Sequence, residues 1–269
     1  MALPPPSQSS AALVTGPSSG IGAEIARELG RRGHGLILVA RREERLRDLA
    51  TEIAGKHGVR VEVIGADLAA PAERDRLTAA IAELGLDVEV LVNNAGFGDS
   101  GPLHTTDRER VVEMVALNCG ALLDLQARYS PAMVERGRGA IINVASTAAF
   151  QPIPGTATYA ATKAFVLSLT EGTHAELKRK GVTVTALCPG PVKTEFAEVA
   201  GVGGTEESLP GLFWTDADFV ARAAVEGADK GKRVVVPGTV NRATAVAGQH
   251  SPRMALLPLA QRMWRSGTK

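Results

Sequence analysis

Short apolar runs alternate with helix-like segments along most of this 269-residue chain, and this alternation constrains the fold more than any other feature. Alternating strands and helices predict a parallel sheet that helices cover on both faces. The sequence shows no internal repeat and no domain boundary, so we predict one α/β domain. The apolar runs that we interpret as strands are 11–15, 35–40, 59–66, 88–93, 140–146, 182–188 and 233–236.

Composition and charge exclude several function classes. A formal net charge of +1 provides no basic surface for nucleic acid. No apolar run approaches the roughly 18 residues of a membrane-spanning helix, so we expect no integral membrane span. Cys119 and Cys188 stand in no pairing or metal-binding pattern, which fits a reducing compartment. Because the first residues also lack the features of a signal peptide, we expect a cytoplasmic protein. The five histidines show no ligand spacing, so we predict no metal site.

The two ends of the chain differ from its centre. Residues 1–10 read MALPPPSQSS and are interpreted as a disordered lead, while residues 11–240 carry the alternating pattern. Residues 241–269 are interpreted as a helical tail, which is amphipathic from Ser251 onward. Within the centre, residues 190–214 lack clear periodicity and are long for a connection in a compact domain. We therefore predict that this segment is a substrate loop.

A glycine-rich turn follows the first apolar run. It reads Gly-Pro-Ser-Ser-Gly-Ile-Gly from Gly16 to Gly22 and leads into a helical pattern. Glycines let a diphosphate approach the backbone, and the N-terminus of the following helix offers free N–H groups and a partial positive charge. The alternative is a plain turn between strand and helix. Its position after the first strand favours the binding of a dinucleotide cofactor.

The end of the second apolar run indicates which dinucleotide binds. Folds that use NAD usually carry an acidic residue there, which binds the ribose 2′-hydroxyl. Here Ala40 is followed by Arg41 and Arg42, and two guanidiniums can bind a 2′-phosphate. The sequence therefore favours NADP(H) over NAD(H). In the alternative interpretation, both arginines are solvated at the start of a helix.

Polar residues also follow the third and fourth runs. Asp67, which precedes Leu68, could accept a hydrogen bond from an adenine amino group or cap the next helix. After the fourth run, Asn94, Ala95 and Gly96 would let the backbone pass close to a ribose. The two asparagines of this segment could equally form a turn.

A tyrosine and a lysine stand one helical turn apart later in the chain. Tyr159 and Lys163 share one face if residues from 156 onward are helical. A tyrosine hydroxyl with a reference pKa of about 10 exchanges protons poorly at neutral pH, and a nearby ammonium favours its phenolate form. Ser146 ends the preceding apolar run, where its hydroxyl could hydrogen-bond a substrate oxygen. Alone, a tyrosine and a lysine at this spacing also occur on ordinary surface helices.

Together, TGPSSGIG, NNAG and the set Ser146, Tyr159 and Lys163 resemble the short-chain dehydrogenase/reductase family over roughly residues 11–238. The resemblance implies a Rossmann-like, doubly wound parallel sheet of about seven strands. It implies that Tyr159 exchanges the proton, that Ser146 orients the substrate oxygen, and that Lys163 binds the nicotinamide ribose. Asn118 matches the fourth catalytic position and is expected to hold a water in a proton relay. The cofactor-binding residues expected are Gly16, Ser18, Ser19, Gly20, Ile21, Gly22, Arg41, Arg42, Asp67, Leu68, Asn94, Ala95, Gly96, Tyr159, Lys163, Pro189, Gly190, Val192 and Thr194.

The resemblance implies an NADP(H)-dependent oxidoreductase that moves a hydride between the nicotinamide and a carbonyl or secondary alcohol. It favours an apolar substrate. One alternative is a catalytically silent NADP(H)-binding sensor or scaffold of the same fold. Another is a sugar-nucleotide epimerase, which the glycine spacing and the short part after Pro189 disfavour. The helices expected at 107–136 and 156–180 resemble the pair that packs across a two-fold axis in this family. A homodimer or homotetramer is therefore expected.

Overall fold

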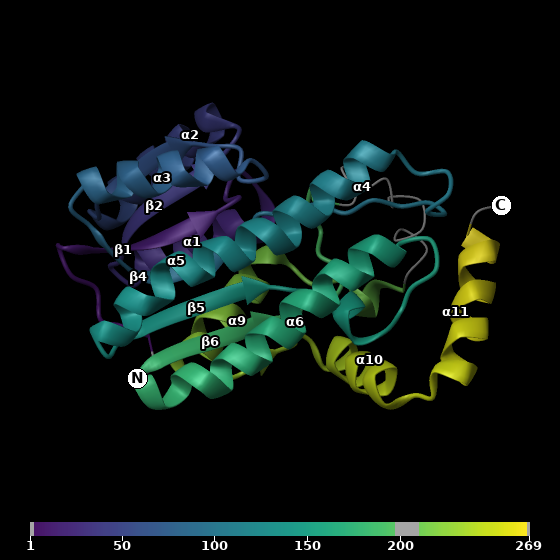
Figure 1. Ribbon diagram of the computed structural model, residues 1–269. Coiled ribbons are helices and arrows are strands. Elements are labelled where there is room, and N and C mark those ends of the chain that lie inside the picture. Colours follow the sequence, from purple (N-terminus) through teal and green to yellow (C-terminus); the bar gives the residue numbers. More distant parts are fainter. Residues whose placement is uncertain (1–2, 197–209, 268–269) are drawn as a thin grey trace.

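The computed structural model describes residues 3–196 and 210–267, and a parallel sheet forms its centre (Figure 1). The strand order is β3-β2-β1-β4-β5-β6-β7, and every adjacent pair is parallel. This confirms the predicted doubly wound α/β fold. The strands are β1 Ser10–Thr15, β2 Gly35–Ala40, β3 Val61–Gly65, β4 Asp87–Asn93, β5 Gly139–Val144, β6 Val182–Leu187 and β7 Val234–Val235.

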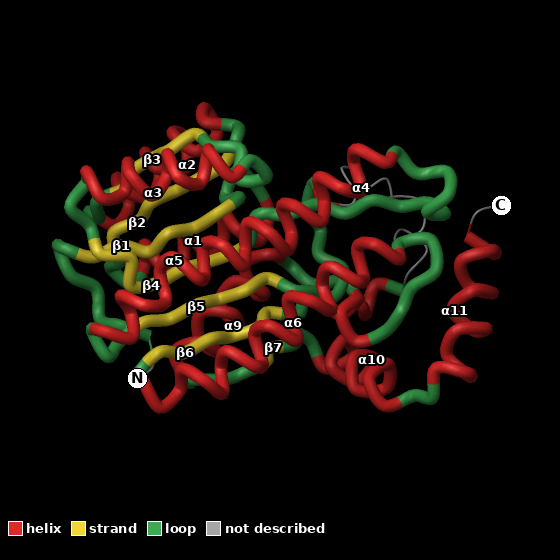
Figure 2. The backbone as a smooth tube through the Cα atoms, viewed as in Figure 1, coloured by secondary structure: helices red, strands yellow, loops and turns green. Residues whose placement is uncertain are grey.

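Helices cover both faces of the sheet, as Figure 2 shows by secondary structure. One face carries α1 (Gly20–Arg31), α2 (Glu43–His57) and α9 (Ala217–Asp229), whose apolar residues share one core cluster. The other face carries α3 (Pro71–Glu83), α5 (Leu122–Glu135) and α6 (Ala157–Leu177).

Alternate residues of β1 contribute to opposite faces of the sheet, because successive side chains of a strand point in opposite directions. Ala12 and Val14 join the first core cluster, and Ala11 and Leu13 join the second. The strand is therefore apolar from Ala11 to Val14, as strands buried on both faces are.

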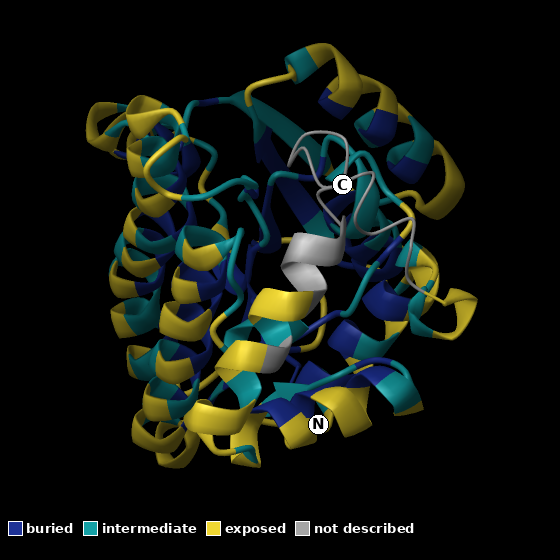
Figure 3. Cartoon of the chain, turned by 90° about the vertical axis from the view of Figure 1, so that its right-hand side faces the viewer, coloured by how far each residue is buried: buried dark blue, intermediate teal, exposed yellow. Residues whose placement is uncertain are grey.

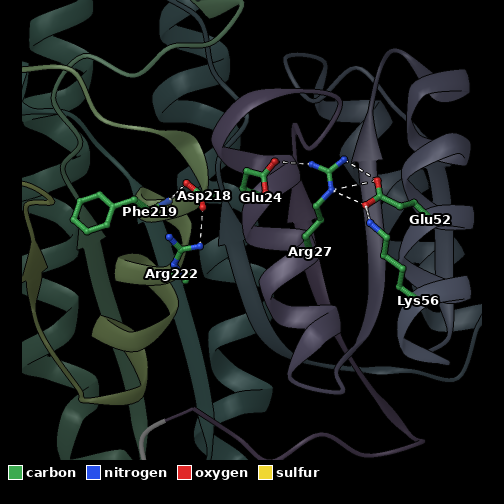
Figure 4. A network of polar contacts seen from close by, with 7 residues as sticks. All are labelled: Glu24, Arg27, Glu52, Lys56, Asp218, Phe219 and Arg222. Carbon is green, nitrogen blue, oxygen red and sulfur yellow. Dashed lines mark hydrogen bonds and ion pairs between the residues drawn. The ribbon is translucent and has the colours of Figure 1, made fainter. Parts of the chain in front are cut away.

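A network of charged side chains joins α1 to α2 beside this core (Figure 4). Arg27 donates to both carboxylate oxygens of Glu52, from Nε at 3.0 Å and from Nη2 at 2.8 Å. Glu24 and Lys56 extend the network at 2.7 and 2.8 Å. Hydrogen bonds from Arg27 and Lys56 lower the pKa of Glu52 to about 2. The network thus connects two helices whose apolar faces already pack together.

The beginning of the chain corrects one prediction. Residues 1–10 were expected to form a disordered lead, but Leu3 is only 8% exposed and belongs to the core, and Ser10 begins β1. Burying the leucine side chain stabilises this segment by about 2 kcal/mol, which offsets part of the entropy lost on ordering it.

The predicted helix at 107–136 contains an irregularity at its centre. It consists of α4 (Arg108–Val115), a π-helical turn at Ala116–Ala121, and α5. Pro131 lies within α5, but the departure from α-helical geometry is at the π turn. Such turns often occur at functional sites. Here the turn carries Asn118, whose side chain is buried.

Two helices follow the sheet, α10 (Thr239–His250) and α11 (Arg253–Gly267). Figure 3 views the molecule from the carboxyl edge of the sheet, and α11 crosses in front of that edge, where most of its residues with a described burial, between 253 and 262, are exposed. Residues 197–209 of the predicted substrate loop lie outside the described residues. Among those that are described, no helix is both long enough and apolar enough to cross a membrane.

Candidate active site

A cavity of about 760 Å³ opens at the carboxyl edge of the sheet, where the strand order reverses between β1 and β4. Ligands bind at such switch points in open α/β sheets, because two adjacent connections leave the edge in opposite directions. The cavity is lined by the predicted site residues, with two exceptions. Gly22 and Asn118 lie behind its wall rather than in it.

Glycines shape the turn between β1 and α1. Gly16 and Gly20 have φ angles of +67° and +59°, a region that favours glycine. A Cβ at Gly22 would lie 2.3 Å from the side-chain nitrogen of Asn94, so only glycine permits this approach. Helix α1 begins at Gly20, and Ser19 forms no side-chain cap there. The first N–H groups of α1 can therefore bind an anion.

Asn94 ties the end of β4 to this turn. Its main-chain N–H donates to Thr15 Oγ1 at 3.0 Å, and its side-chain nitrogen donates to the carbonyl oxygens of Thr15 and Gly16, both at 3.0 Å. Ala95 also donates to Thr15 Oγ1. Asn94 thus fixes the conformation of the glycine-rich turn in addition to lining the cavity.

The two predicted arginines differ in their surroundings. The Arg42 guanidinium donates to Ser18 Oγ from Nη2 at 2.8 Å and from Nε at 3.2 Å, and to Ser19 Oγ at 3.2 Å. Arg41 instead pairs with Glu113 at 3.3 Å. Both line the cavity, but only Arg42 is held against the glycine-rich turn.

Asp67 occupies the turn after β3. Its carboxylate accepts a hydrogen bond from the N–H of Ala69 at 3.1 Å, while Ala70 is the N-cap of α3. Asp67 therefore does not cap α3. Its carboxylate instead stabilises the turn that precedes the helix. Asp67 and Leu68 both line the cavity.

Tyr159 and Lys163 lie one turn apart on α6, as their spacing predicts. Lys163 Nζ is 5.7 Å from the centre of the Tyr159 ring and donates to the carbonyl oxygen of Val144 at 2.8 Å. Its side chain is 6% exposed, and burial lowers the pKa of Lys163 to about 8. The Tyr159 ring also packs against Phe196, with ring centres 5.6 Å apart.

Ser146 lies two residues beyond β5 and lines the same cavity. Its Oγ accepts a hydrogen bond from the N–H of Ala148 at 3.1 Å. Because that bond uses the hydroxyl only as an acceptor, its O–H can donate to a substrate oxygen.

The Asn118 side chain bonds the loop that follows β4. Its side-chain oxygen accepts from the N–H of Phe97 at 3.1 Å, and its nitrogen donates to the Phe97 carbonyl at 2.9 Å and to Thr162 Oγ1 at 3.1 Å. A Cβ at Gly96 would lie 2.7 Å from the Asn118 oxygen. The Asn118 side chain therefore holds the loop at Phe97 that follows β4, and the role of Asn118 in holding a water stays a prediction.

The part of the cavity beyond Tyr159 contains residues that the sequence motifs did not indicate. Phe97 directly follows the NNAG segment and Phe196 follows Thr194, so their positions beside motifs could have suggested them. Thr244 and Ala245 come from α10, which carries no motif. The additional residues at this end are Phe97, Leu117, Ala148, Gln151, Ile153, Phe196, Thr244 and Ala245, whereas Glu195 lines the cavity beside Arg42.

Fold and site together define a nucleotide-binding oxidoreductase of the Rossmann-like class. The sequence profile of the family described as short chain dehydrogenase matches residues 10–201. The chain belongs to the short-chain dehydrogenase/reductase family, which confirms the predicted family.

Individual relatives extend this result. A very-long-chain 3-oxoacyl-CoA reductase of Anas platyrhynchos is 36% identical over 194 residues, which are 70% of this chain and 62% of the relative. The match thus spans less than two thirds of that protein's length. A short-chain dehydrogenase from Sphingobium yanoikuyae, solved in complex with NADPH, is 38% identical with a TM-score of 0.78, covering 93% of this chain and 95% of its own. A bulky-bulky ketone specific alcohol dehydrogenase from Comamonas testosteroni is 32% identical with a TM-score of 0.74, covering 96% and 94%.

The residues present fit a dinucleotide cofactor. Gly16 lets the turn pack closely against the segment after β4, where a Cβ would lie 2.8 Å from Ala95 Cα, so main-chain atoms of the turn line the cavity. The start of α1 offers N–H groups at this point, and Arg42 lies beside it on Ser18. The cavity then continues to Lys163 and Tyr159, so one continuous space joins the start of α1 to this pair.

Proposed function

We propose that this chain is an NADP(H)-dependent reductase of apolar ketones or 3-oxoacyl compounds, which also catalyses the reverse oxidation of the alcohols. One observation carries the proposal: a single cavity is lined by Ser146, Tyr159 and Lys163 and also by Arg42, which is held on Ser18. When bound, the nicotinamide cofactor supplies the hydride. The protein contributes binding, orientation and proton transfer.

At the anion-binding end, each group has a distinct task. The N–H groups at the start of α1 bind the diphosphate, since they are positive and lack partners within the helix. Arg42 binds the 2′-phosphate, because a guanidinium offers several donors in one plane. Asp67 accepts a hydrogen bond from the adenine amino group.

At the catalytic end, Tyr159 O–H gives the proton to the substrate oxygen. Ser146 O–H donates a hydrogen bond to the same oxygen and stabilises the negative charge that develops there. Lys163 binds the nicotinamide ribose, and its ammonium stabilises Tyr159 after the proton has left. Asn118 holds the loop at Phe97, which also lines the cavity.

The lining beyond Tyr159 supports an uncharged, apolar substrate. Phe97, Ile153 and Phe196 contribute apolar side chains, and Gln151 and Thr244 contribute neutral polar ones. The carboxylate of Asp99 also lines the cavity, but it is paired with Arg110 at 3.2 Å. Of the described residues that line the cavity, the cations are Arg41, Arg42 and Lys163, and each is assigned above to the cofactor end. The names of the relatives, a 3-oxoacyl-CoA reductase and a ketone-specific alcohol dehydrogenase, support the same substrate class.

A substrate screen tests this function. NADPH oxidation would be measured with bulky aryl ketones, cyclic ketones and 3-oxoacyl thioesters, and NADP⁺ reduction with the matching alcohols. Tyr159→Phe should lower turnover by roughly 10²–10⁴-fold, because it removes the proton donor, while NADPH binding followed by cofactor fluorescence stays nearly constant. Tyr129→Phe is the matched control, since Tyr129 is the other tyrosine of the chain and lies outside the described cavity lining. Full activity in Tyr159→Phe would refute the mechanism. NADPH binding without turnover on any carbonyl would favour the silent sensor.

We further propose that the chain forms a homodimer or homotetramer through α4, α5 and α6. Val112, Leu123 and Phe165 on these helices are 56%, 44% and 39% exposed, and exposed apolar side chains on adjacent helices mark an interaction surface. Light scattering of wild type should give at least twice the 28.0 kDa mass of the chain. Phe165→Glu should shift the mass toward the monomer, and a monomer in wild type at micromolar concentration would contradict the proposal.

A further inference from the structure

In the segment after β6, the carboxylate of Glu195 lies between two arginines. Arg42 is the N-cap of α2, and Arg45 lies within that helix. Glu195 Oε2 is 3.0 Å from Arg42 Nη1, and Arg45 Nη1 lies 2.7 and 2.9 Å from the two Glu195 oxygens. About 150 residues separate the partners in sequence. The ion pairs therefore connect the segment after β6 to the N-terminal half of the sheet.

Arg42 uses two edges of its guanidinium for two different tasks. Nη2 and Nε donate to Ser18 Oγ in the glycine-rich turn, while Nη1 donates to Glu195. A 2′-phosphate that binds Arg42 would bring a second anion to a guanidinium that already carries one. Hydrogen bonds from Arg45 and Arg42 lower the pKa of Glu195, so this carboxylate is charged at neutral pH. Two anions at hydrogen-bond distance from one guanidinium repel each other.

The two neighbours of Glu195 contact different parts of the cavity. Phe196 packs against the Tyr159 ring, and Thr194 lies within 3.2 Å of the position that a Cβ of Gly20 would occupy. A displacement of Glu195 would thus change the packing both at the start of α1 and beside Tyr159.

We propose that Glu195 is an internal competitor for the 2′-phosphate, a role that rests on the proposed use of NADP(H). The phosphate displaces the Glu195 carboxylate from Arg42, and this exchange shifts residues 192–196 beside Tyr159. Glu195 thereby sets the affinity for the phosphorylated cofactor and couples it to the substrate end of the cavity. Arg45 stays paired with the Glu195 carboxylate both with and without bound phosphate.

Two adenosine nucleotides distinguish the contribution of the 2′-phosphate to binding from that of the rest of the cofactor. Calorimetry would compare adenosine 2′,5′-bisphosphate with adenosine 5′-monophosphate in wild type and in Glu195→Gln. Loss of a partly exposed competing charge should tighten binding of the bisphosphate by about threefold to tenfold, with the monophosphate unchanged. Glu44→Gln is the matched control, since it removes an exposed negative charge from the same helix and should change neither nucleotide by as much as twofold.

Tryptic cleavage at Lys193 reports on the segment itself, because Lys193 lies two residues from Glu195. The bisphosphate should raise the cleavage rate in wild type, and Glu195→Gln should be cleaved at the raised rate without nucleotide. Weaker or unchanged bisphosphate binding in Glu195→Gln would overturn the proposal, as would cleavage that does not respond to the bisphosphate. If wild type shows no preference for the bisphosphate over the monophosphate, the proposed use of NADP(H) itself fails, which is a separate result.

Discussion

Lys163 Nζ donates a hydrogen bond of 2.8 Å to the main-chain oxygen of Val144, which joins α6 to the last residue of β5. The same burial that shapes this contact lowers the pKa of Lys163 to about 8 from an ordinary value of 10.5. A buried ammonium is costly because the protein interior solvates it poorly. Lys163 therefore destabilises the protein without cofactor in the pH range where its side chain is charged.

This cost predicts a pH-dependent stability. Between pH 8 and pH 10.5 the unfolded chain binds the Lys163 proton and the folded chain does not, so wild type gains stability relative to Lys163→Met as pH rises. The shift corresponds to about 3 kcal/mol. Urea unfolding of both proteins at pH 7 and pH 10 measures the change in their difference. A difference that stays constant between these pH values would show that the lysine is solvated.

Asn118→Leu should destabilise the protein and reduce activity. Leucine cannot replace the two hydrogen bonds to the Phe97 main chain, and each buried group left without a partner costs about 1–3 kcal/mol. Thr162→Val is the control, because it removes the other contact of Asn118 and leaves the Phe97 bonds in place. Denaturant unfolding should show a clearly larger loss for Asn118→Leu. Equal losses would mean that the Phe97 contact contributes little.

Gly22→Ala should weaken NADPH binding by displacing Asn94. The added Cβ would lie 2.3 Å from the Asn94 side-chain nitrogen, so the bonds from Asn94 to Thr15 and Gly16 must be lost or distorted. The double variant Gly22→Ala with Asn94→Ala should lose less affinity for NADPH than the sum of the losses in the two single variants. The effects of substituting two residues in contact are not additive. If the losses of NADPH affinity are additive, the effect of Gly22→Ala does not act through Asn94.

Arg42→Ala should reduce NADPH affinity more than Arg41→Ala does. Arg42 is held on Ser18, whereas Arg41 is 63% exposed in its side chain and pairs with Glu113. A charge-assisted hydrogen bond contributes about 1.5–3 kcal/mol, so wild type should prefer NADPH to NADH by roughly ten to several hundredfold. Replacing Ala40 with aspartate and Arg41 with a neutral residue should narrow that ratio. Dissociation constants for both cofactors decide the matter, and equal values in wild type would mean that neither arginine binds the phosphate.

Local patterns in the sequence were enough to predict the fold and many of the residues that line the cavity. The alternation of strands and helices depends on the side-chain periodicity of each element, and the glycine-rich turn depends on φ angles that Gly16 and Gly20 adopt easily. The helical spacing of Tyr159 and Lys163 is likewise a local property. These features follow from residues close together in the chain.

Tertiary structure decided everything that depends on contacts between distant residues. The sequence could not show that Asn118 bonds Phe97, that Glu195 lies on Arg42 and Arg45, or that α10 contributes Thr244 and Ala245 to the cavity. Leu3 in a segment of prolines and serines gave no sign of its burial. The physical reason is the same for each. Burial, competition for a donor and a shifted pKa such as that of Lys163 depend on which groups surround a residue after folding, and the packing of the whole chain sets those surroundings.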